Sequence, residues 1–276
     1  MSERSHAVAN RYHSLSMAWR TYRAEAIVLR TVDLGEADRI LVLFTRHFGK
    51  IHVVAKGIRR ATSRMAGHAE PLTHATYQLA RGRELDVLTG AEARALYPAL
   101  REDLGRIAAG WYCAELTDRF TVERVPTASL FDLLETSLRH LDAGYPAALV
   151  CRWFDLHLLD RSGFRPELAD CVSCRESLEE RENAWSAPAG GALCESCSRK
   201  AGAGMTLSVR ALKSLRYLLV SDFASASQLR VDAVLGGELE RHMRIFVQHV
   251  IDREITAARL IDEIRALPPR PAPVIS

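Results

Sequence analysis

Hydrophobic positions follow two different periods along this chain of 276 residues, and the change falls at Pro98. Before it, short β-branched segments alternate with Gly-bearing or polar connections, which is the pattern of antiparallel hairpins. Five strands within about 70 residues favour a small closed β-barrel over a sandwich. The predicted strands are Ala24–Val32, Asp38–Arg46, Lys50–Lys56, His74–Ala80 and Glu84–Thr89.

After Pro98 the apolar residues recur with the 3.6-residue period of amphipathic helices. Gly144 and Gly163 are placed to end two of these helices, and Pro268 and Pro269 to end the last. The predicted helices are Ala99 to about Thr121, Thr127 or Ser129 to Leu141, Pro146 to Ser162, one resuming at Thr206, and one from near Gly237 to Leu267.

The fold class expected from these patterns is multidomain α+β. Residues 18–97 form the barrel, and residues 98–267 form an all-α domain with a Gly-, Pro- and Ser-rich insert at 165–205. Residues 1–17 are polar and without a period, so we expect a disordered tail or a start site assigned too early. Residues 268–276 are expected to be a flexible tail.

Four of the six cysteines stand in two C-x-x-C pairs, Cys171 with Cys174 and Cys194 with Cys197. This spacing is typical of a zinc site, in which two tight turns each direct two thiolates at one ion. Two redox dithiols or cysteines without metal are the alternatives. Four thiolates complete a tetrahedral Zn²⁺, so one structural ion per chain is predicted, which stabilises an insert with few apolar residues. Cys113 and Cys151 lie in apolar helical patterns and are expected in the core.

Charge is distributed unevenly along the chain. Residues 18–97 carry 13 Lys and Arg against 8 Asp and Glu, whereas residues 98–276 carry 22 against 25. A basic barrel could bind a nucleic acid backbone, with Phe44, Phe48 or Tyr77 stacking on bases. A solvated basic surface over core aromatics is the alternative. The candidate DNA-binding residues are Arg30, Arg39, Arg46, Lys50, Lys56, Arg59, Arg60 and Arg64.

No recognisable catalytic motif accompanies these features. The sequence contains no Walker-type phosphate loop, dinucleotide-binding glycine fingerprint, nucleophile elbow or His-Glu-x-x-His motif. It has no apolar run of membrane-spanning length and no apolar core of a secretory signal near its start, so a cytoplasmic protein is expected. A protein that binds rather than catalyses is favoured.

Three N-terminal segments closely resemble the RecO family of bacterial DNA repair proteins: Tyr22–Arg30, Leu34–Arg46 and Gly49–Gly57. Gly163–Pro166 and the paired C-x-x-C knuckles are also similar to that family. The resemblance runs from about Tyr22 to Leu267 and is looser in the helices.

The resemblance implies an N-terminal OB-fold barrel and a helical domain with a zinc module. It also implies a recombination mediator that binds single- and double-stranded DNA, anneals complementary strands, works with RecR in the RecFOR pathway, engages single-strand binding protein and helps load RecA. A nucleoid-associated location in the cytoplasm follows. A zinc-ribbon regulator or scaffold, or an RNA-modifying enzyme with a structural zinc, are the alternatives.

A mediator of this kind needs a site for a partner peptide. The resemblance suggests the acidic, aromatic C-terminal tail of single-strand binding protein, which requires an apolar slot and cations. The candidate residues in the predicted helices are Trp111, Arg119, Phe120, Arg124, Phe131 and Arg139, with Arg106 and Leu134 beside them.

Overall fold

The computed structural model describes residues 21–202 and 204–267, and these divide into two compact units. The barrel unit comprises the described residues up to Tyr97 together with Thr121–Glu135, and the helical unit comprises Pro98–Phe120 and the described residues from Thr136. One boundary of the units falls between Tyr97 and Pro98, and Thr121–Glu135 belongs to the barrel unit. The predicted tails at 1–17 and 268–276 lie outside the described residues.

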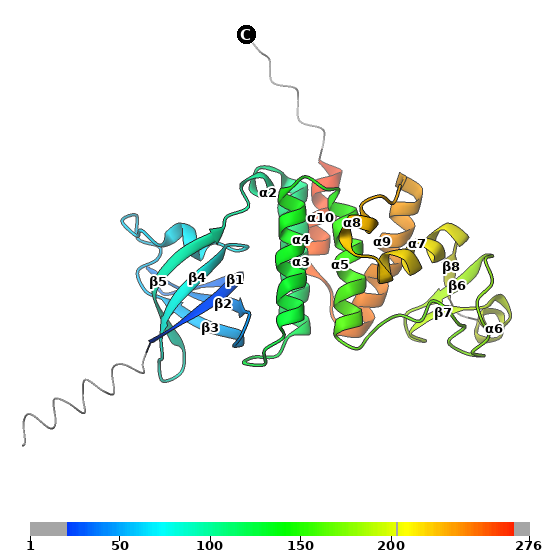
Figure 1. Cartoon of the computed structure of the whole chain (residues 1–276), viewed down its shortest axis with the longest axis horizontal. Coiled ribbons are helices and arrows are strands. Elements are labelled where there is room, and N and C mark those ends of the chain that lie inside the picture. Colours follow the sequence, from blue (N-terminus) through cyan, green and yellow to red (C-terminus); the bar gives the residue numbers. More distant parts are fainter. Residues whose placement is uncertain (1–20, 203, 268–276) are drawn as a thin grey trace, which may run out of the picture. The chain divides into compact units, whose positions relative to one another are not determined.

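Five strands close a barrel, as the sequence predicted, and their order in the structure is β1-β2-β3-β5-β4 (Figure 1). All neighbouring pairs are antiparallel except β3 and β5, where Val53 pairs with Asp86 in parallel. This is the topology of an OB-fold. The strands are β1 (Thr21–Leu34), β2 (Asp38–Thr45), β3 (Gly49–Ala55), β4 (His74–Ala80) and β5 (Asp86–Ala95), with a short 3-10 helix, η1 (Ala66–Ala69), before β4.

Both faces of strand β2 are buried, for different reasons. Leu41 and Leu43 belong to the barrel core. Phe44 alternates with them, yet it is fully buried, because its ring lies 5.9 Å from that of Phe131. The segment Thr121–Glu135 thus covers an outer apolar face of the barrel, which explains why it belongs to this unit.

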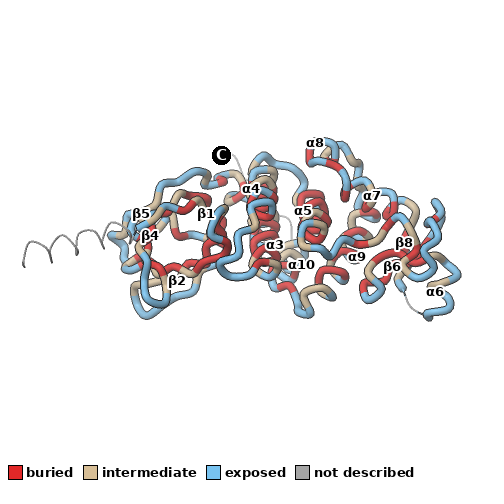
Figure 2. Tube along the Cα trace, turned by 60° about the horizontal axis from the view of Figure 1, so that its bottom comes forward, coloured by how far each residue is buried: buried red, intermediate tan, exposed pale blue. Residues whose placement is uncertain are grey.

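The helical unit is arranged around α5 (Ala147–Arg161), in which ten of fifteen residues are buried (Figure 2). A helix buried on nearly all sides must be covered by several others. Helix α4 (Ala128–Asp142) begins within Thr121–Glu135 and ends in the helical unit. The remaining helices of this unit's main body are α2 (Pro98–Glu102), α3 (Leu104–Phe120), α7 (Val209–Val220), α8 (Phe223–Ala226), α9 (Ala233–Ile251) and α10 (Thr256–Ala266).

The single long helix predicted from Gly237 to Leu267 is wrong. Helix α9 ends at Ile251, and the next residue, Asp252, adopts the left-handed conformation with φ 50°. Helix α10 then starts without a side-chain cap of its own. Its first N–H groups, those of Thr256 and Ala257, donate to the carboxylate of Glu115 on α3 at 3.0 and 2.7 Å. Tertiary capping therefore allows the break, and periodicity alone could not reveal it.

The cysteine-bearing insert contains a small antiparallel sheet that the sequence reading did not predict. Strands β6 (Asn183–Ser186), β7 (Gly191–Leu193) and β8 (Met205–Leu207) pair in the order β7-β6-β8, and α6 (Glu195–Ala201) follows β7. Helical structure resumes at Val209 rather than at Thr206, because Thr206 belongs to β8 and Ser208 caps α7. Among residues 21–202 and 204–267, no helix combines the length and the apolarity needed to cross a membrane.

Candidate metal centre and nucleic-acid interface

The structure brings the four cysteines of the insert together. The sulfur atoms of Cys171, Cys174, Cys194 and Cys197 all lie within 4.8 Å of one another, and those of Cys174 and Cys194 are 3.8 Å apart. Four thiolates at about 2.3 Å from one zinc ion are separated by about 3.8 Å in a regular tetrahedron. The cluster therefore fits a four-coordinate metal ion without rearrangement of the backbone.

Each C-x-x-C pair is shaped by local backbone hydrogen bonds. In the first, the N–H of Arg175 donates to the carbonyl of Cys171 at 2.9 Å, and Arg175 adopts a positive φ of 65° that turns the chain back. In the second, Cys194 precedes α6 and Cys197 lies in the first turn of that helix. The two turns meet where the N–H of Cys194 donates to the sulfur of Cys171 at 3.3 Å.

The thiols differ in acidity because their hydrogen-bond partners differ. The pKa of Cys194 is lowered to about 6, first by Ser196, whose Oγ lies 3.2 Å from its sulfur, and then by the N–H of Cys197. The N–H of Glu176 favours the thiolate of Cys174, but desolvation and hydrogen bonds to the other three thiols raise its pKa to about 12. Thiolates this close to one another repel each other, and a divalent cation between them offsets this repulsion. The donor set thus suits a soft metal ion.

The cysteine-bearing insert is joined to α9 through Trp185. The indole is only 1 % exposed, and its ring centroid lies 5.3 Å from that of Phe246. Gly191, at the start of β7, has φ 156°, and a side chain there would meet the carbonyl oxygen of Glu167 at 2.2 Å. The close turn that ends at Gly190 and Gly191 joins β6 to β7 as an antiparallel hairpin.

The strand register places five of the eight candidate DNA-binding residues at or just after one end of the β2–β3 pair, two at the other end, and Arg30 between the ends. Arg39 pairs with Ala55 where β2 begins and β3 ends, and Lys56, Arg59, Arg60 and Arg64 follow directly. Arg46 and Lys50 lie at the opposite end, where Thr45 pairs with Gly49. Arg30 is exposed on β1 between them.

Three members of the set are engaged within the barrel unit. Arg46 contacts the carboxylates of Glu25, Asp132 and Glu135, and its guanidinium lies 4.6 Å from the ring centroid of Phe131. Arg39 pairs with Asp33 at 2.9 Å and with Glu70 at 3.1 Å. Lys50 is only 9 % exposed. These side chains have structural partners that would compete with phosphate.

Four further candidates, Lys56, Arg59, Arg60 and Arg64, follow β3 and are termed here the basic segment. All four side chains are exposed. Arg59 donates to the carbonyl of Gly35 at 3.2 Å and lies 3.5 Å from Asp33, whereas Lys56, Arg60 and Arg64 form no ion pair within residues 21–202 and 204–267. The N–H of Arg59 donates to the carbonyl of Ala37 at 3.0 Å, so the segment is fixed against the turn between β1 and β2.

The candidate peptide-binding residues are divided between the two units. Arg124 and Phe131 belong to the barrel unit, and Phe131 is fully buried there against Phe44. Trp111, Phe120, Arg119 and Arg139 belong to the helical unit; Trp111 is 39 % exposed, and Arg119 pairs with Glu115 on its own helix.

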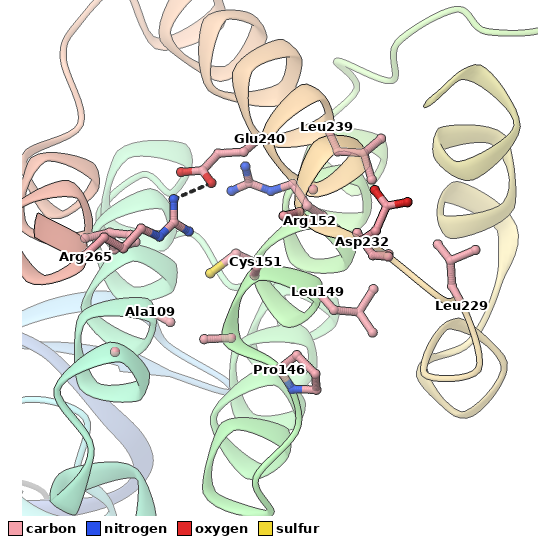
Figure 3. A pocket seen from close by; sticks show the side chains of 18 of the residues that line it. Ala109, Pro146, Leu149, Cys151, Arg152, Leu229, Asp232, Leu239, Glu240 and Arg265 are labelled. Carbon is pink, nitrogen blue, oxygen red and sulfur yellow. Dashed lines mark hydrogen bonds and ion pairs between the residues drawn. The ribbon is translucent and has the colours of Figure 1, made fainter. Parts of the chain in front are cut away.

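The helical unit also contains a cavity of about 440 Å³ that sequence reasoning missed (Figure 3). Its wall is largely apolar, and the guanidinium of Arg152 lies in it near Glu240. Arg152 is 7 % exposed and pairs with Asp155 at 2.9 Å, yet its Nε and Nη1 have no hydrogen-bond partner among the described residues. Lining residues include Ala109, Pro146, Leu149, Cys151, Leu229, Leu239 and Arg265. Arg152 stands in an apolar helical stripe, which is the one sequence signal that could have indicated it.

A closed OB barrel with exposed cations, followed in the same chain by helices that carry a four-cysteine centre, defines a multidomain nucleic-acid-binding architecture. Two family models match it: "Recombination protein O N terminal" over residues 17–97 and "Recombination protein O C terminal" over residues 101–258. The chain belongs to the RecO family of DNA repair and recombination proteins.

Relatives from several bacteria match most of the chain. It is 38% identical over 248 residues to the DNA repair protein RecO of Roseiflexus sp. (strain RS-1), covering 90% of this chain and 87% of the relative. It is 35% identical over 244 residues to the protein of that name from Dehalococcoides mccartyi (strain BAV1), covering 88% and 96%. For Heliobacterium modesticaldum (strain Ice1) the identity is 40% over 236 residues, covering 84% of each chain.

Proposed function

We propose that this protein is a recombination mediator that binds single- and double-stranded DNA through its barrel unit and anneals complementary strands without catalysing a reaction. The observation that carries the proposal is the basic segment. It places four exposed cations on an OB barrel, and three of them form no ion pair in the described ranges. Exposed cations bind the phosphates of a nucleic acid whatever its base sequence, and this binding releases the counterions that surround the nucleic acid.

Annealing follows from the same electrostatics. Two complementary strands repel each other through their phosphates, and a protein that neutralises part of this charge on both strands lowers the cost of bringing them together. No chemical step is needed, which agrees with the lack of a recognisable catalytic motif in the sequence.

Cooperation with RecR, assistance in loading RecA and a nucleoid-associated place in the cytoplasm belong to the same proposal. They are supported by membership of the RecO family and by the names of the relatives, which are DNA repair proteins. For the four-cysteine centre we propose Zn²⁺ as the resident ion, because four thiolates in a tetrahedral cluster are the usual donor set of structural zinc. The cysteines hold the ion, and its role is to stabilise the fold of the insert.

The partner-peptide function is proposed for the cavity beside Arg152. A tail that ends in an aromatic residue and carries carboxylates needs an apolar slot and cationic N–H donors. The cavity offers both, since its wall is mainly apolar and the guanidinium-bearing residues Arg152 and Arg265 line it. Glu240, the nearby carboxylate, is neutralised by Arg265 at 2.6 Å and Arg244 at 2.8 Å. We therefore propose that the C-terminal tail of single-strand binding protein binds here.

The DNA-binding function is tested by the salt dependence of affinity. In R59A/R60A, the slope of log K against log salt should flatten by about 1.4 for single strands and about 1.8 for duplex, corresponding to two lost phosphate contacts. The matched control is R230A/R253A, which removes two exposed arginines of the helical unit and should leave both slopes unchanged. An unchanged slope in R59A/R60A would place the DNA contact elsewhere, and a change only in the control would place it on the helical unit.

A further inference from the structure

Phe48 is an exposed ring on a rigid turn of the barrel. Of the three rings that the sequence offers for stacking, Phe44 and Tyr77 are fully buried, whereas Phe48 is 38 % exposed. It lies in the turn between β2 and β3. Its N–H donates to Thr45 Oγ1 at 2.8 Å, and Thr45 Oγ1 donates to the carbonyl of Gly49 at 2.8 Å. The ring is therefore held outward by a hydrogen-bonded turn.

The turn is also fixed by close backbone packing. Gly49 has φ 68°, and a side chain there would meet the backbone nitrogen of Val125 at 2.5 Å. Arg124, the neighbour of Val125, donates its N–H to the carbonyl of Lys50 at 2.9 Å. The segment after α3 thus holds this end of the barrel in one conformation, so little ordering cost remains for a ligand.

Phe48 rests on a second ring that is itself anchored. The ring centroids of Phe48 and Tyr22 are 5.1 Å apart in an edge-to-face arrangement. The hydroxyl of Tyr22 donates to the carboxylate of Asp86 at 2.5 Å, and the guanidinium of Arg81 lies 5.4 Å from the Tyr22 ring centroid. The buried Asp86 is occupied by this contact and by the N–H of Gly82.

The charge around the two rings is positive. Arg81 and Arg83 are exposed in the loop between β4 and β5, which also carries the exposed Glu84. The charges of Arg124 and Arg81 both act on the hydroxyl of Tyr22, where they oppose the rise in pKa caused by burial and by Asp86. A rigid exposed ring beside guanidinium groups matches a nucleotide, whose base has a π-face and whose phosphate is an anion.

We propose that Phe48 is a stacking platform for an unpaired nucleobase, with Arg81 and Arg124 beside it to receive the adjoining phosphate. The inference rests on the proposed function that the barrel binds DNA, and it adds a site that distinguishes single strands from duplex. A base within a duplex is already stacked on its neighbours and cannot lie on Phe48, whereas an unpaired base can. The basic segment binds both substrates, and the Phe48 platform binds only one.

The test compares F48A with F164A, a control that removes an exposed ring of the helical unit. Affinity is measured at fixed salt for an oligo-dT strand and for a duplex of equal length. Loss of one stacked base should lower single-strand affinity of F48A by about 5- to 150-fold. The affinity of F48A for duplex should stay within twofold of the value for the unchanged chain, and its slope of log K against log salt should stay close to that of the unchanged chain. F164A should have the affinities of the unchanged chain for both substrates.

Two further variants separate stacking from loss of structure. F48L keeps an apolar side chain but has no π-face, so it should show the loss of F48A, whereas F48W should retain single-strand affinity. Equal binding of single strands by F48A and the unchanged chain would overturn the platform while the proposed function stands. An equal loss for duplex would also overturn it. If the unchanged chain bound neither the single strand nor the duplex, the proposed function and this inference would both be overturned.

Discussion

The indole nitrogen of Trp185 donates a hydrogen bond to the backbone carbonyl of His242 across 3.1 Å. This bond joins β6, the central strand of the sheet in the cysteine-bearing insert, to the middle of α9. Trp185 therefore connects the order of the insert to the packing of the helical unit, since its ring also packs on Phe246. Loss of the metal ion should consequently affect α9 as well as the knuckles.

Metal content is the most direct prediction. Purified protein should contain one zinc ion per chain, and C194S should contain much less, because three thiolates hold the ion less well than four. Structural zinc binding is worth about 10 kcal/mol or more in small zinc domains, so C194S should also unfold at a lower temperature. Elemental analysis and calorimetry measure the two effects. C151A, which changes a buried cysteine outside the cluster, should keep its zinc; equal zinc in C194S would contradict the assignment.

Substitution of Trp185 should destabilise the helical unit without removing a metal ligand. W185A empties a buried aromatic position and should cost about 3–5 kcal/mol. W185F keeps a ring but removes the N–H donor, with an expected cost of about 0.5–1.5 kcal/mol. Urea unfolding measures both, and zinc content should stay near one per chain in W185F. A stability of W185A equal to that of the unchanged chain would mean that the insert and α9 are energetically independent.

Arg46 should behave as a structural residue rather than a DNA contact. R46A leaves the carboxylates of Glu25, Asp132 and Glu135 without their shared cation, so we expect a loss of about 1.5–3 kcal/mol in unfolding free energy. Under conditions where R46A remains folded, the salt slope for DNA should equal that of the unchanged chain, in contrast to R59A/R60A. A flattened slope in folded R46A would return this arginine to the DNA-binding surface.

The contrast between the cysteines and Arg46 shows what the sequence could predict. Only the turn between Cys171 and Cys174 is required to direct their two thiols at one point, and the C-x-x-C spacing predicts that turn. Arg46 contacts Asp132, which is 86 positions away in the sequence, and no local sequence pattern predicts that contact. For the same reason the five strands were predictable from their alternation. The burial of Phe131 and the break at Asp252 depend on partners distant in sequence, so they were not.

Acid should weaken the attachment of α10 to α9. Arg244 Nη2 donates to Asp262 Oδ1 at 2.9 Å, and this bond lowers the pKa of Asp262 below its ordinary value. A carboxyl with a lowered folded-state pKa stabilises the protein above its unfolded-state pKa, and this contribution is lost as the pH falls through the folded-state value. Because Asp262 is half exposed, the contribution should be below about 1 kcal/mol.

The measurement is the urea midpoint between pH 5 and pH 3. The midpoint should fall less steeply in D262N, which has no carboxyl to protonate. E263Q changes the neighbouring exposed carboxyl on the same helix and should follow the unchanged chain. A steeper fall in D262N than in E263Q would contradict the role given to the pair of Arg244 and Asp262.

The cavity beside Arg152 yields the last prediction. Gly237 lines it from α9, and a Cβ added there meets no atom within 4 Å, so we expect G237F to be accommodated and to narrow the cavity. We expect a labelled acidic peptide ending in an aromatic residue to bind the unchanged chain. Its affinity for G237F should be at least about tenfold lower, because the aromatic ring of the peptide loses its apolar slot. Amidation of the peptide's terminal carboxylate should also weaken binding, since the arginines that line the cavity, Arg152 and Arg265, then lose their anion. Fluorescence anisotropy measures each affinity.

V234F is the control, because Val234 is exposed on α9 and does not line the cavity. If G237F bound the peptide as tightly as V234F, the partner site would lie elsewhere, and the exposed ring of Trp111 on α3 would be the next position to substitute.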